Sequence, residues 1–292
     1  MMSTAPIQRD LVLIGGGHAT IQVLRSFGMS PIEGVRVTLI TDVLKAPYSG
    51  MLPGFVEGIW SEDNIMFDLA ALSAFAGARL IHSAITHIDV EEKFVILQSA
   101  APVSYDIISV NTGAVPDTSN ITGAHENALR VKPIAGFLHN LPKIDKITAD
   151  LAIIGAGAAG SELALALRAR MTASAQRPNI HLIGRAANIL PRHSSAASRI
   201  MKLALDKANI TCHLGSPVRA IDKQAVTLEN GTVIAAKICL MVTAARPADW
   251  VSGLPVARDE RGFLAVTSSL HLPDRPDFFA AGDIASVIGY ER

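Results

Sequence analysis

The sequence predicts an α/β protein with two Rossmann-like dinucleotide-binding domains, the second inserted in the first. Two apolar segments each run into a glycine cluster and then into a helical pattern: "VLIGGGHATIQVLR" (12–25) and "ADLAIIGAGAAGSELALAL" (149–167). Hydrophobic content of 49% with only 5% aromatic residues indicates a core of Ala, Val, Ile and Leu, which is typical of α/β layering.

The second half of the chain repeats the pattern of the first. Each glycine segment is followed by a β-branched run, and later by a strand that ends in a turn: "VRVTLIT" (35–41) and "YDIISVNTGAVP" (105–116), then "NIHLIGR" (179–185) and "AKICLMVTAARP" (236–247). Gly15 aligns with Gly155, and Thr112 aligns with Thr243. An apolar run of about five residues before each glycine cluster fits a strand buried on both faces of a parallel sheet. Two βαβ-type units therefore indicate two nucleotide-binding domains.

Composition excludes several other classes. Lys+Arg and Asp+Glu both number 26, so the clustered basic excess of a nucleic-acid-binding protein is not expected. Cys212 and Cys239 lie far apart in apolar, strand-like runs and form no C-x-x-C, which predicts structural thiols and no dithiol relay. The nine histidines show no metal-ligand spacing, and no G-x-S-x-G is present, so neither a metal site nor a hydrolase is predicted.

Targeting and membrane segments are not predicted either. No apolar stretch that ends in a small-residue cleavage site precedes the first glycine segment. The longest apolar segment is glycine-rich and carries Glu162 near its middle, so it is predicted to be a strand, turn and helix and not a membrane span.

The first glycine corner (residues 15–20) has the features of a diphosphate cradle. Gly15 allows a tight turn, and Gly17 lets the backbone approach a pyrophosphate, while the following helix presents its amides and its dipole. Thr20 stands where a third glycine is usual, which predicts slightly wider packing of helix against strand. Asp42, just beyond the next strand, either holds a ribose hydroxyl or is a loop aspartate. His18 either reaches a phosphate or lies on the helix surface.

The second glycine corner (residues 155–160) has the full pattern in Gly155, Gly157 and Gly160. The next strand ends at Arg185 without a carboxylate, which favours the 2′-phosphate of NADPH; a solvated loop arginine is the alternative, and both nicotinamide cofactors remain open. Glu162 either complements the helix dipole or lies near the nicotinamide and flavin rings.

The segment "FFAAGDIAS" (278–286) supplies a third anchor. An apolar run ends in Gly282 and Asp283 and is followed by helix-like residues, so Asp283 either caps a helix or contacts a polyol such as a flavin ribityl chain. Together with two dinucleotide cradles, the sequence favours the second role.

With these residues assembled, the chain resembles the pyridine nucleotide-disulfide oxidoreductases. The motifs "GGGHAT", "NTGAVP", "GAGAAGSE" and "FFAAGD" occur in the family's order and cover almost the whole chain. The stretches "APYSGMLPG" (46–54) and "RVKPIAGFL" (130–138) look like the branch related to type II NADH dehydrogenases, which is often joined to selenide, water dikinase. That branch works without a redox cysteine pair.

The resemblance implies FAD in the first corner, NAD(P)H in the second and an acidic residue, Glu162, near the rings as the catalytic candidate. Residues 48–54 would lie close to the flavin, although the same stretch could simply pack on the sheet. The predicted cofactor-binding residues are Gly15, Gly16, Gly17, His18, Ala19, Asp42, Tyr48, Ser49, Met51, Leu52, Pro53, Thr112, Gly113, Gly155, Gly157, Ala158, Ala159, Gly160, Arg185, Gly282 and Asp283.

The implied function is an FAD-dependent NAD(P)H oxidoreductase that passes electrons directly to a quinone or another small acceptor. The alternatives are a flavoprotein domain fused to or serving selenide, water dikinase, and a non-catalytic flavin-binding scaffold. The expected location is cytoplasmic, with peripheral association with the inner membrane as the other option.

The expected domains are residues 1–118 (FAD-binding), 119–264 (NAD(P)H-binding) and 265–292 (the return to the FAD-binding domain). In the family a helix and an interface domain follow the Gly-Asp turn. Because Arg292 is only a few residues beyond Asp283, the chain is expected to be a fragment of a longer polypeptide, with a truncated family member as the alternative.

Overall fold

A computed structural model describes residues 6–118, 120–146, 148–171, 178–243 and 245–290. The chain divides into two units. The first unit comprises Met1–Ala46, Met66–Val115 and Arg246–Arg292, and the second unit comprises Pro47–Ile65 and Pro116–Ala245. The second unit therefore interrupts the first in sequence, as predicted.

The limits of the units differ from the expected domain boundaries. The chain returns to the first unit at Arg246 and not at residue 265, because Val251 and Leu254 are buried in the same apolar cluster as Ile108 of the first unit's sheet. Residues 47–65 join the second unit, since Leu52 and Val56 are buried against its core. The expected boundary at 118/119 involves residue 119, which lies outside the described residues, as do residues 1 and 292.

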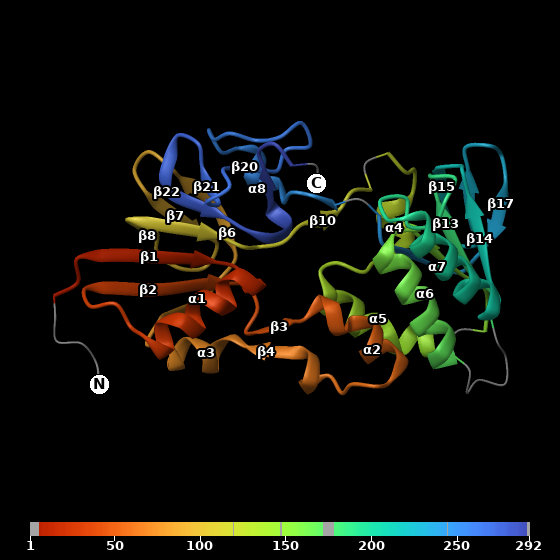
Figure 1. The fold of residues 1–292 in the computed structure, drawn as a ribbon, viewed down its shortest axis with the longest axis horizontal. Helices are drawn as coiled ribbons and strands as arrows, with labels where there is room; N and C mark the ends of the chain where they lie inside the picture. Colours follow the sequence, from red (N-terminus) through yellow and green to blue (C-terminus); the bar gives the residue numbers. More distant parts are fainter. Residues whose placement is uncertain (1–5, 119, 147, 172–177, 244, 291–292) are drawn as a thin grey trace. The chain divides into compact units, whose positions relative to one another are not determined.

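The first unit is built on a six-stranded sheet in the order β21-β22-β9-β1-β2-β5, in which every pair from β22 to β5 is parallel and only β21 runs antiparallel (Figure 1). Its strands are β1 (Arg9–Ile14), β2 (Val35–Thr41), β5 (Arg79–His82), β9 (Ile107–Val110), β21 (His271–Leu272) and β22 (Arg275–Ala280). The β2 range is the one predicted from the sequence.

Two layers cover the faces of this sheet. Helices α1 (His18–Met29) and α3 (Leu69–Phe75) pack on one face, where Leu13 and Leu39 are buried. On the other face Val12 and Ile40 are buried beneath a small antiparallel sheet and α8. Alternation of side chains along buried parallel strands thus supplies two cores from one sheet. The covering elements are β6 (Ile85–Asp89), β7 (Phe94–Leu97), β8 (Val103–Ser104), α8 (Asp249–Ser252), β20 (Leu264–Val266) and β23 (Ala285–Val287).

The second unit repeats this plan. Its five-stranded parallel sheet has the order β11-β18-β12-β13-β14. The elements are α2 (Leu52–Glu57), α4 (Ala124–Asn127), β11 (Ala128–Arg130), α5 (Ile134–Asp145), β12 (Leu151–Ile154), α6 (Ala158–Arg170), β13 (Ile180–Gly184), α7 (Ser195–Lys207), β14 (Ile210–Leu214), β15 (Val218–Ile221), β16 (Ala225–Leu228), β17 (Val233–Ala235) and β18 (Ile238–Met241).

Helices pack on one face of the second sheet and a small antiparallel sheet packs on the other. Ile153 and Leu182 are buried with Leu163 of α6 on the helical side. Ile154 and Met241 are buried on the side of β15, β16 and β17. The predicted duplication is therefore present at the level of whole layers, with β1 and β9 matched by β12 and β18.

Several short elements join the larger ones. They are β3 (Lys45–Pro47), η1 (Ser49–Met51), η2 (Asp63–Ile65), β4 (Met66–Asp68), β10 (Val115–Pro116), β19 (Ala245–Arg246) and η4 (Gly282–Ile284).

The prediction of a helix after the Gly-Asp pair is wrong for the described residues. Residues Gly282–Ile284 form a single 3-10 turn, and Ala285–Val287 then form β23, which pairs in parallel with β20. The strand is favoured because it leaves Val287 packed against the apolar cluster that contains Leu264 and Val266.

Candidate functional site

The first glycine corner lies where β1 meets α1. Gly15 has φ +85°, which L side chains rarely adopt, and an added Cβ would lie 2.7 Å from the Asn111 carbonyl oxygen. Gly17 is the N-cap residue of α1, and an added Cβ there would lie 2.1 Å from Asn111 Oδ1. Both glycines are thus required by the residue at the end of β9, because no side chain fits between the turn and Asn111.

Asn111 connects three parts of the first unit. Its Oδ1 accepts hydrogen bonds from the backbone amides of Ala19 at 3.1 Å and Thr20 at 3.4 Å. Its Nδ2 donates to the Ala281 carbonyl at 2.6 Å. The residue is 4% exposed. Sequence reasoning did not single it out; the available signal was an amide residue in "SVNTGAVP" where the repeat carries Val242.

The Gly-Asp segment lies at the same sheet edge as the first corner. Gly282 has φ +73°, and an added Cβ would lie 2.6 Å from Asn111 Nδ2. Asp283 is exposed in the turn that follows β22. The turn begins from Ala281 without a side-chain cap, so the alternative of Asp283 as a helix N-cap is wrong.

The second glycine corner has the same path but a different lining. Gly155 has φ +126°, and an added Cβ would lie 2.5 Å from the Val242 carbonyl oxygen. At Gly160 an added Cβ would lie 1.8 Å from the Gly155 carbonyl oxygen, whereas at Gly157 it would meet nothing within 4 Å. The helix α6 therefore packs tightly on the turn and leaves open space beside Gly157, its N-cap residue.

The third position of each corner shows how closely helix and strand approach. Thr20, which aligns with Gly160, is 1% exposed and its Oγ1 has no hydrogen-bond partner. A side chain is accommodated at Thr20, while even a methyl group at Gly160 would overlap backbone. This agrees with the predicted wider packing in the first corner.

Polar residues follow the carboxyl ends of the neighbouring strands. Arg185 is exposed directly after β13, and Asp42 is exposed directly after β2. The Asp42 carbonyl lies 3.1 Å from His82 Nε2. Thr112 is exposed and Gly113 has φ +75° after β9. In doubly wound sheets, ligands bind outside the carboxyl ends of the strands, at the point where the strand order reverses.

The remaining predicted residues divide between surface and core. Tyr48 is 37% exposed, whereas Leu52 is 6% exposed and packs in the core of the second unit. The Leu52 side chain therefore lies in the protein interior, and the exposed part of the segment is Tyr48, Ser49 and Gly50. Glu162 is exposed on α6. His18 is exposed on α1, with its ring edge-on to Phe67 at 6.0 Å between centroids.

The two cysteines lie on separate strands of the second sheet. Cys239 is on β18 and Cys212 is on β14, with β12 and β13 between them. Three strand spacings separate them by about 14 Å, which is too far for a disulfide. Burial raises the pKa of the Cys239 thiol to about 12 and also raises the pKa of Cys212. Neither thiol is placed to act as a redox relay.

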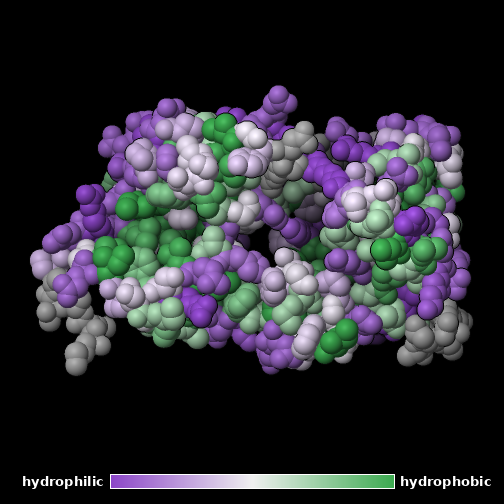
Figure 2. Space-filling model, viewed as in Figure 1, coloured by the Kyte–Doolittle hydropathy of each residue, from purple (hydrophilic) through white to green (hydrophobic). Residues whose placement is uncertain are grey.

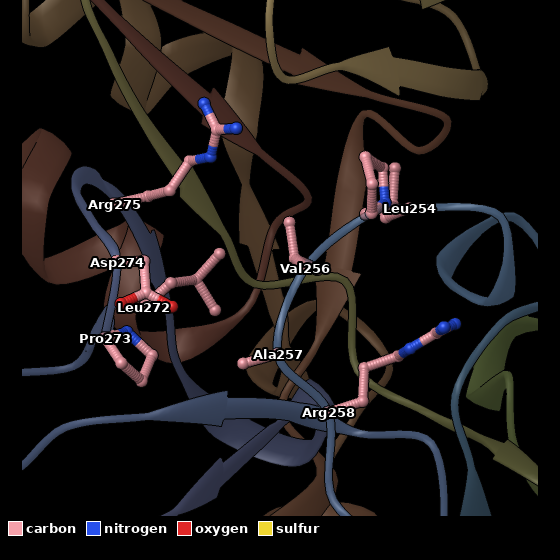
Figure 3. A pocket seen from close by; sticks show the side chains of 9 residues that line it. Leu254, Val256, Ala257, Arg258, Leu272, Pro273, Asp274 and Arg275 are labelled. Atoms are coloured by element: carbon pink, nitrogen blue, oxygen red, sulfur yellow. The ribbon is translucent and has the colours of Figure 1, made fainter.

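Two other features lie away from the corners. A cavity of about 530 Å³ is lined by Leu254–Arg258 and Leu272–Arg275 (Figure 3). It lies beside the amino end of β22, whereas Gly282 follows the carboxyl end of the same strand. Of its lining residues, Arg258 donates to the Val251 carbonyl and Arg275 donates to the Val90 carbonyl. Within the described residues, no three His, Cys, Asp or Glu side chains form a group that could hold a metal ion.

Two sheet units, each with a glycine corner between a buried parallel strand and the helix that follows it, define a protein with two dinucleotide-binding folds. The chain belongs to the pyridine nucleotide-disulphide oxidoreductase family, whose pattern matches residues 9–291. Membership confirms the predicted class of enzyme and the predicted cofactors, FAD and NAD(P)H.

The sequence identity between this chain and individual relatives is low. The chain is 27% identical to the NADH dehydrogenase-like protein YutJ of Bacillus subtilis, over 96% of this chain and 77% of that protein. It is 22% identical to the demethylphylloquinone reductase NdbB of Synechocystis, over 94% of this chain and 71% of that protein. The structure of NDH2 from Plasmodium falciparum in complex with NADH matches with a TM-score of 0.83 at 16% identity. That match covers 96% of this chain and 65% of the NDH2 chain, and it shows the fold.

Over the part of the chain that the structure describes, every helix is too short or too polar to cross a bilayer. Exposed apolar side chains do occur on α7, where Ile200 is 67% and Leu203 is 63% exposed. On the face viewed in Figure 2, hydrophobic residues are interspersed with hydrophilic ones.

Proposed function

We propose that the chain carries the two cofactor-binding domains of an FAD-dependent NAD(P)H oxidoreductase that delivers electrons directly to a quinone or a similar small acceptor. The first unit is the proposed FAD-binding domain, and the second unit is the proposed NAD(P)H-binding domain. The observation that carries the proposal is the pair of glycine corners, each of which opens a helix at the carboxyl end of a buried parallel strand.

The first corner fits a dinucleotide that is held permanently. Gly15 and Gly17 keep the turn free of side chains, and the positive end of α1 favours the negative charge of a diphosphate. Asp283 is exposed at the same end of the sheet, where its carboxylate would accept hydrogen bonds from a polyol chain. When bound, FAD supplies the redox chemistry, by accepting hydride from the nicotinamide.

The second corner fits a dinucleotide that exchanges. The first amides of α6 have no partner within the helix, and the space beside Gly157 is open. Arg185 follows β13 at the position where an acidic residue would contact a ribose and an arginine would contact a 2′-phosphate. NADPH is therefore the better fit, and NADH is the second candidate.

Two further assignments rest on the family resemblance. Glu162, exposed on α6 beyond the second corner, is proposed as the acidic residue next to the rings. Tyr48, Ser49, Met51 and Pro53 are proposed to flank the flavin through their exposed and half-buried atoms.

Direct delivery to the acceptor is supported by the cysteines. The two thiols are separated by two strands and have raised pKa values, so a dithiol intermediate has no place to form. A quinone is the proposed acceptor because the relative NdbB is named a demethylphylloquinone reductase. Service to selenide, water dikinase remains a prediction from the resemblance.

Anaerobic reduction of the full-length protein tests the proposal. The purified protein should be yellow, should release FAD on denaturation, and should bleach when NADPH or NADH is added. Added quinone should then restore the colour repeatedly.

The double variant Cys212→Ala, Cys239→Ala is the matched control and should turn over like the wild type. A colourless protein that cannot be reconstituted with FAD would contradict the proposal. Reduction that never cycles with quinones or dyes would favour a flavin-binding scaffold.

A further inference from the structure

Asn111 occupies the inner side of the first corner. The side chain is 4% exposed, and its two polar atoms are both used: Oδ1 accepts from the amides of Ala19 and Thr20, and Nδ2 donates to the Ala281 carbonyl. These partners belong to the start of α1 and to the Gly-Asp turn, which are separated by most of the length of the chain.

The matching position in the second corner is Val242, which follows β18 as Asn111 follows β9. A valine side chain has no acceptor for the first amides of α6. Those amides, at the exposed start of α6, are left for a ligand oxygen or for water as acceptor. In the first corner the protein supplies this acceptor itself.

We propose that Asn111 is a positioning residue that assembles the FAD corner before the cofactor binds. Its amide fixes the start of α1 relative to the Gly282–Asp283 turn, so that the positive end of the helix and the Asp283 carboxylate already stand at the same end of the sheet. The proposal rests on the assignment of FAD to the first corner. Its consequence is tight retention, since a corner that is ordered in advance loses less freedom on binding.

Only a primary amide side chain of this length meets both requirements. One atom must accept from two N–H groups, and the other must donate to a carbonyl. An aspartate has the same shape, but it places an acceptor against the Ala281 carbonyl and a negative charge beside the diphosphate site. An alanine removes all three bonds and leaves room for water.

The experiment compares Asn111→Asp and Asn111→Ala in the full-length protein. After removal of FAD, the dissociation constant for added FAD is measured by quenching of flavin fluorescence. It should rise about twentyfold or more in Asn111→Asp, where one carboxylate oxygen faces the Ala281 carbonyl without a donor, and about fivefold in Asn111→Ala. The dissociation constant for NADPH, measured on the same preparations, should change by less than about twofold.

Asn127→Asp is the matched control. The Asn127 Nδ2 also donates to backbone carbonyls, those of Gly123 and Ile221, but it does so in the second unit. This variant should leave the FAD constant at the wild-type value. If Asn111→Asp does not fold, as judged by NADPH binding and circular dichroism, the FAD constant of Asn111→Ala decides.

FAD constants within about twofold of wild type in the folded Asn111 variants would overturn the inference and leave the proposed function intact. A wild-type protein that does not bind FAD would overturn the proposed function instead. A purely structural role for Asn111 would lower the melting temperature of the FAD-free protein and leave FAD affinity unchanged, which also contradicts the inference.

Discussion

The two glycine corners make similar backbone turns but differ in what lies beside the second glycine. In the first corner, Gly17 lies against the Asn111 side chain, and the first turn of α1 accommodates the buried side chain of Thr20. In the second corner, the space beside Gly157 is open, and Gly160 touches the Gly155 carbonyl so closely that a methyl group does not fit. Similar sequence patterns thus produce one corner in which a protein side chain packs against the second glycine and one corner in which the second glycine faces open space.

This difference assigns different energetic roles to glycines that occupy equivalent positions. A glycine whose missing side chain makes room for protein is required for stability, because substitution forces packed atoms to move. A glycine that faces open space is required only by what binds there. The corners also suggest a division of labour between a retained cofactor and an exchanging one, and the following variants test it.

The largest expected effect is on stability and comes from Gly160→Ala. The added methyl group would overlap the backbone at the Gly155 carbonyl, so the helix start must move. We expect the free energy of unfolding to fall by about 3 kcal/mol, measured by urea denaturation. At the aligned position Thr20→Ala should cost about 1 kcal/mol or less, because a Cβ is already accommodated there. An equal loss in the free energy of unfolding in the two variants would contradict the difference in packing between the corners.

The second comparison separates stability from binding. Gly157→Ala should leave the melting temperature unchanged and weaken NADPH binding about tenfold, because the methyl group takes space beside the proposed diphosphate. Gly17→Ala should lower the melting temperature and release FAD, because its methyl group displaces Asn111. Thermal unfolding and titration with each cofactor measure both effects. A Gly157→Ala protein with normal NADPH affinity would contradict the open-corner assignment.

Arg185→Ala sharpens the assignment of the exchanging cofactor. Loss of the exposed guanidinium after β13 should raise the dissociation constant for NADPH about tenfold while that for NADH stays within about twofold. Arg199→Ala, an exposed arginine on α7, controls for the change in net charge. If both cofactors weaken equally, Arg185 does not contact a 2′-phosphate.

The smallest expected effect is a pH dependence confined to the second unit. His213 Nε2 lies 3.1 Å from His181 Nδ1, and burial together with that neighbour lowers the pKa of His213 below its usual 6.5. The unfolded chain therefore binds a proton before the folded chain does, and stability should fall as the pH drops below about 6.5. The loss in melting temperature between pH 7.5 and pH 5.5 should be smaller in His213→Gln. An equal loss in the variant would exclude His213 as the cause.

Much of the fold could be predicted from local pattern. The β2 strand agrees with its predicted range, and both glycine turns lie between a buried strand and a helix. These features depend on neighbours in sequence: apolar runs, β-branched residues and glycines. The predicted helix after Asp283 failed because β23 is held by pairing with β20, a partner distant enough that no local pattern specifies it.

The site residues that sequence reasoning missed depend on three-dimensional register. Asn111 contacts the first corner and Ala281 only because β9 lies between β1 and β22 in the sheet. Leu52, which the family resemblance predicts beside the flavin, is buried with the core around α6, a contact that its local sequence does not specify. In both cases the deciding contact joins residues that are remote in sequence.

Counting bound dinucleotides tests the central claim most directly. Native mass spectrometry of the full-length protein, titrated with unreactive NADP⁺, reports whether FAD and the nicotinamide cofactor occupy one chain together. The two-corner account predicts one FAD and one NADP⁺ per chain, with FAD retained at saturating NADP⁺. Displacement of FAD by NADP⁺, or binding of a single dinucleotide per chain, would contradict it.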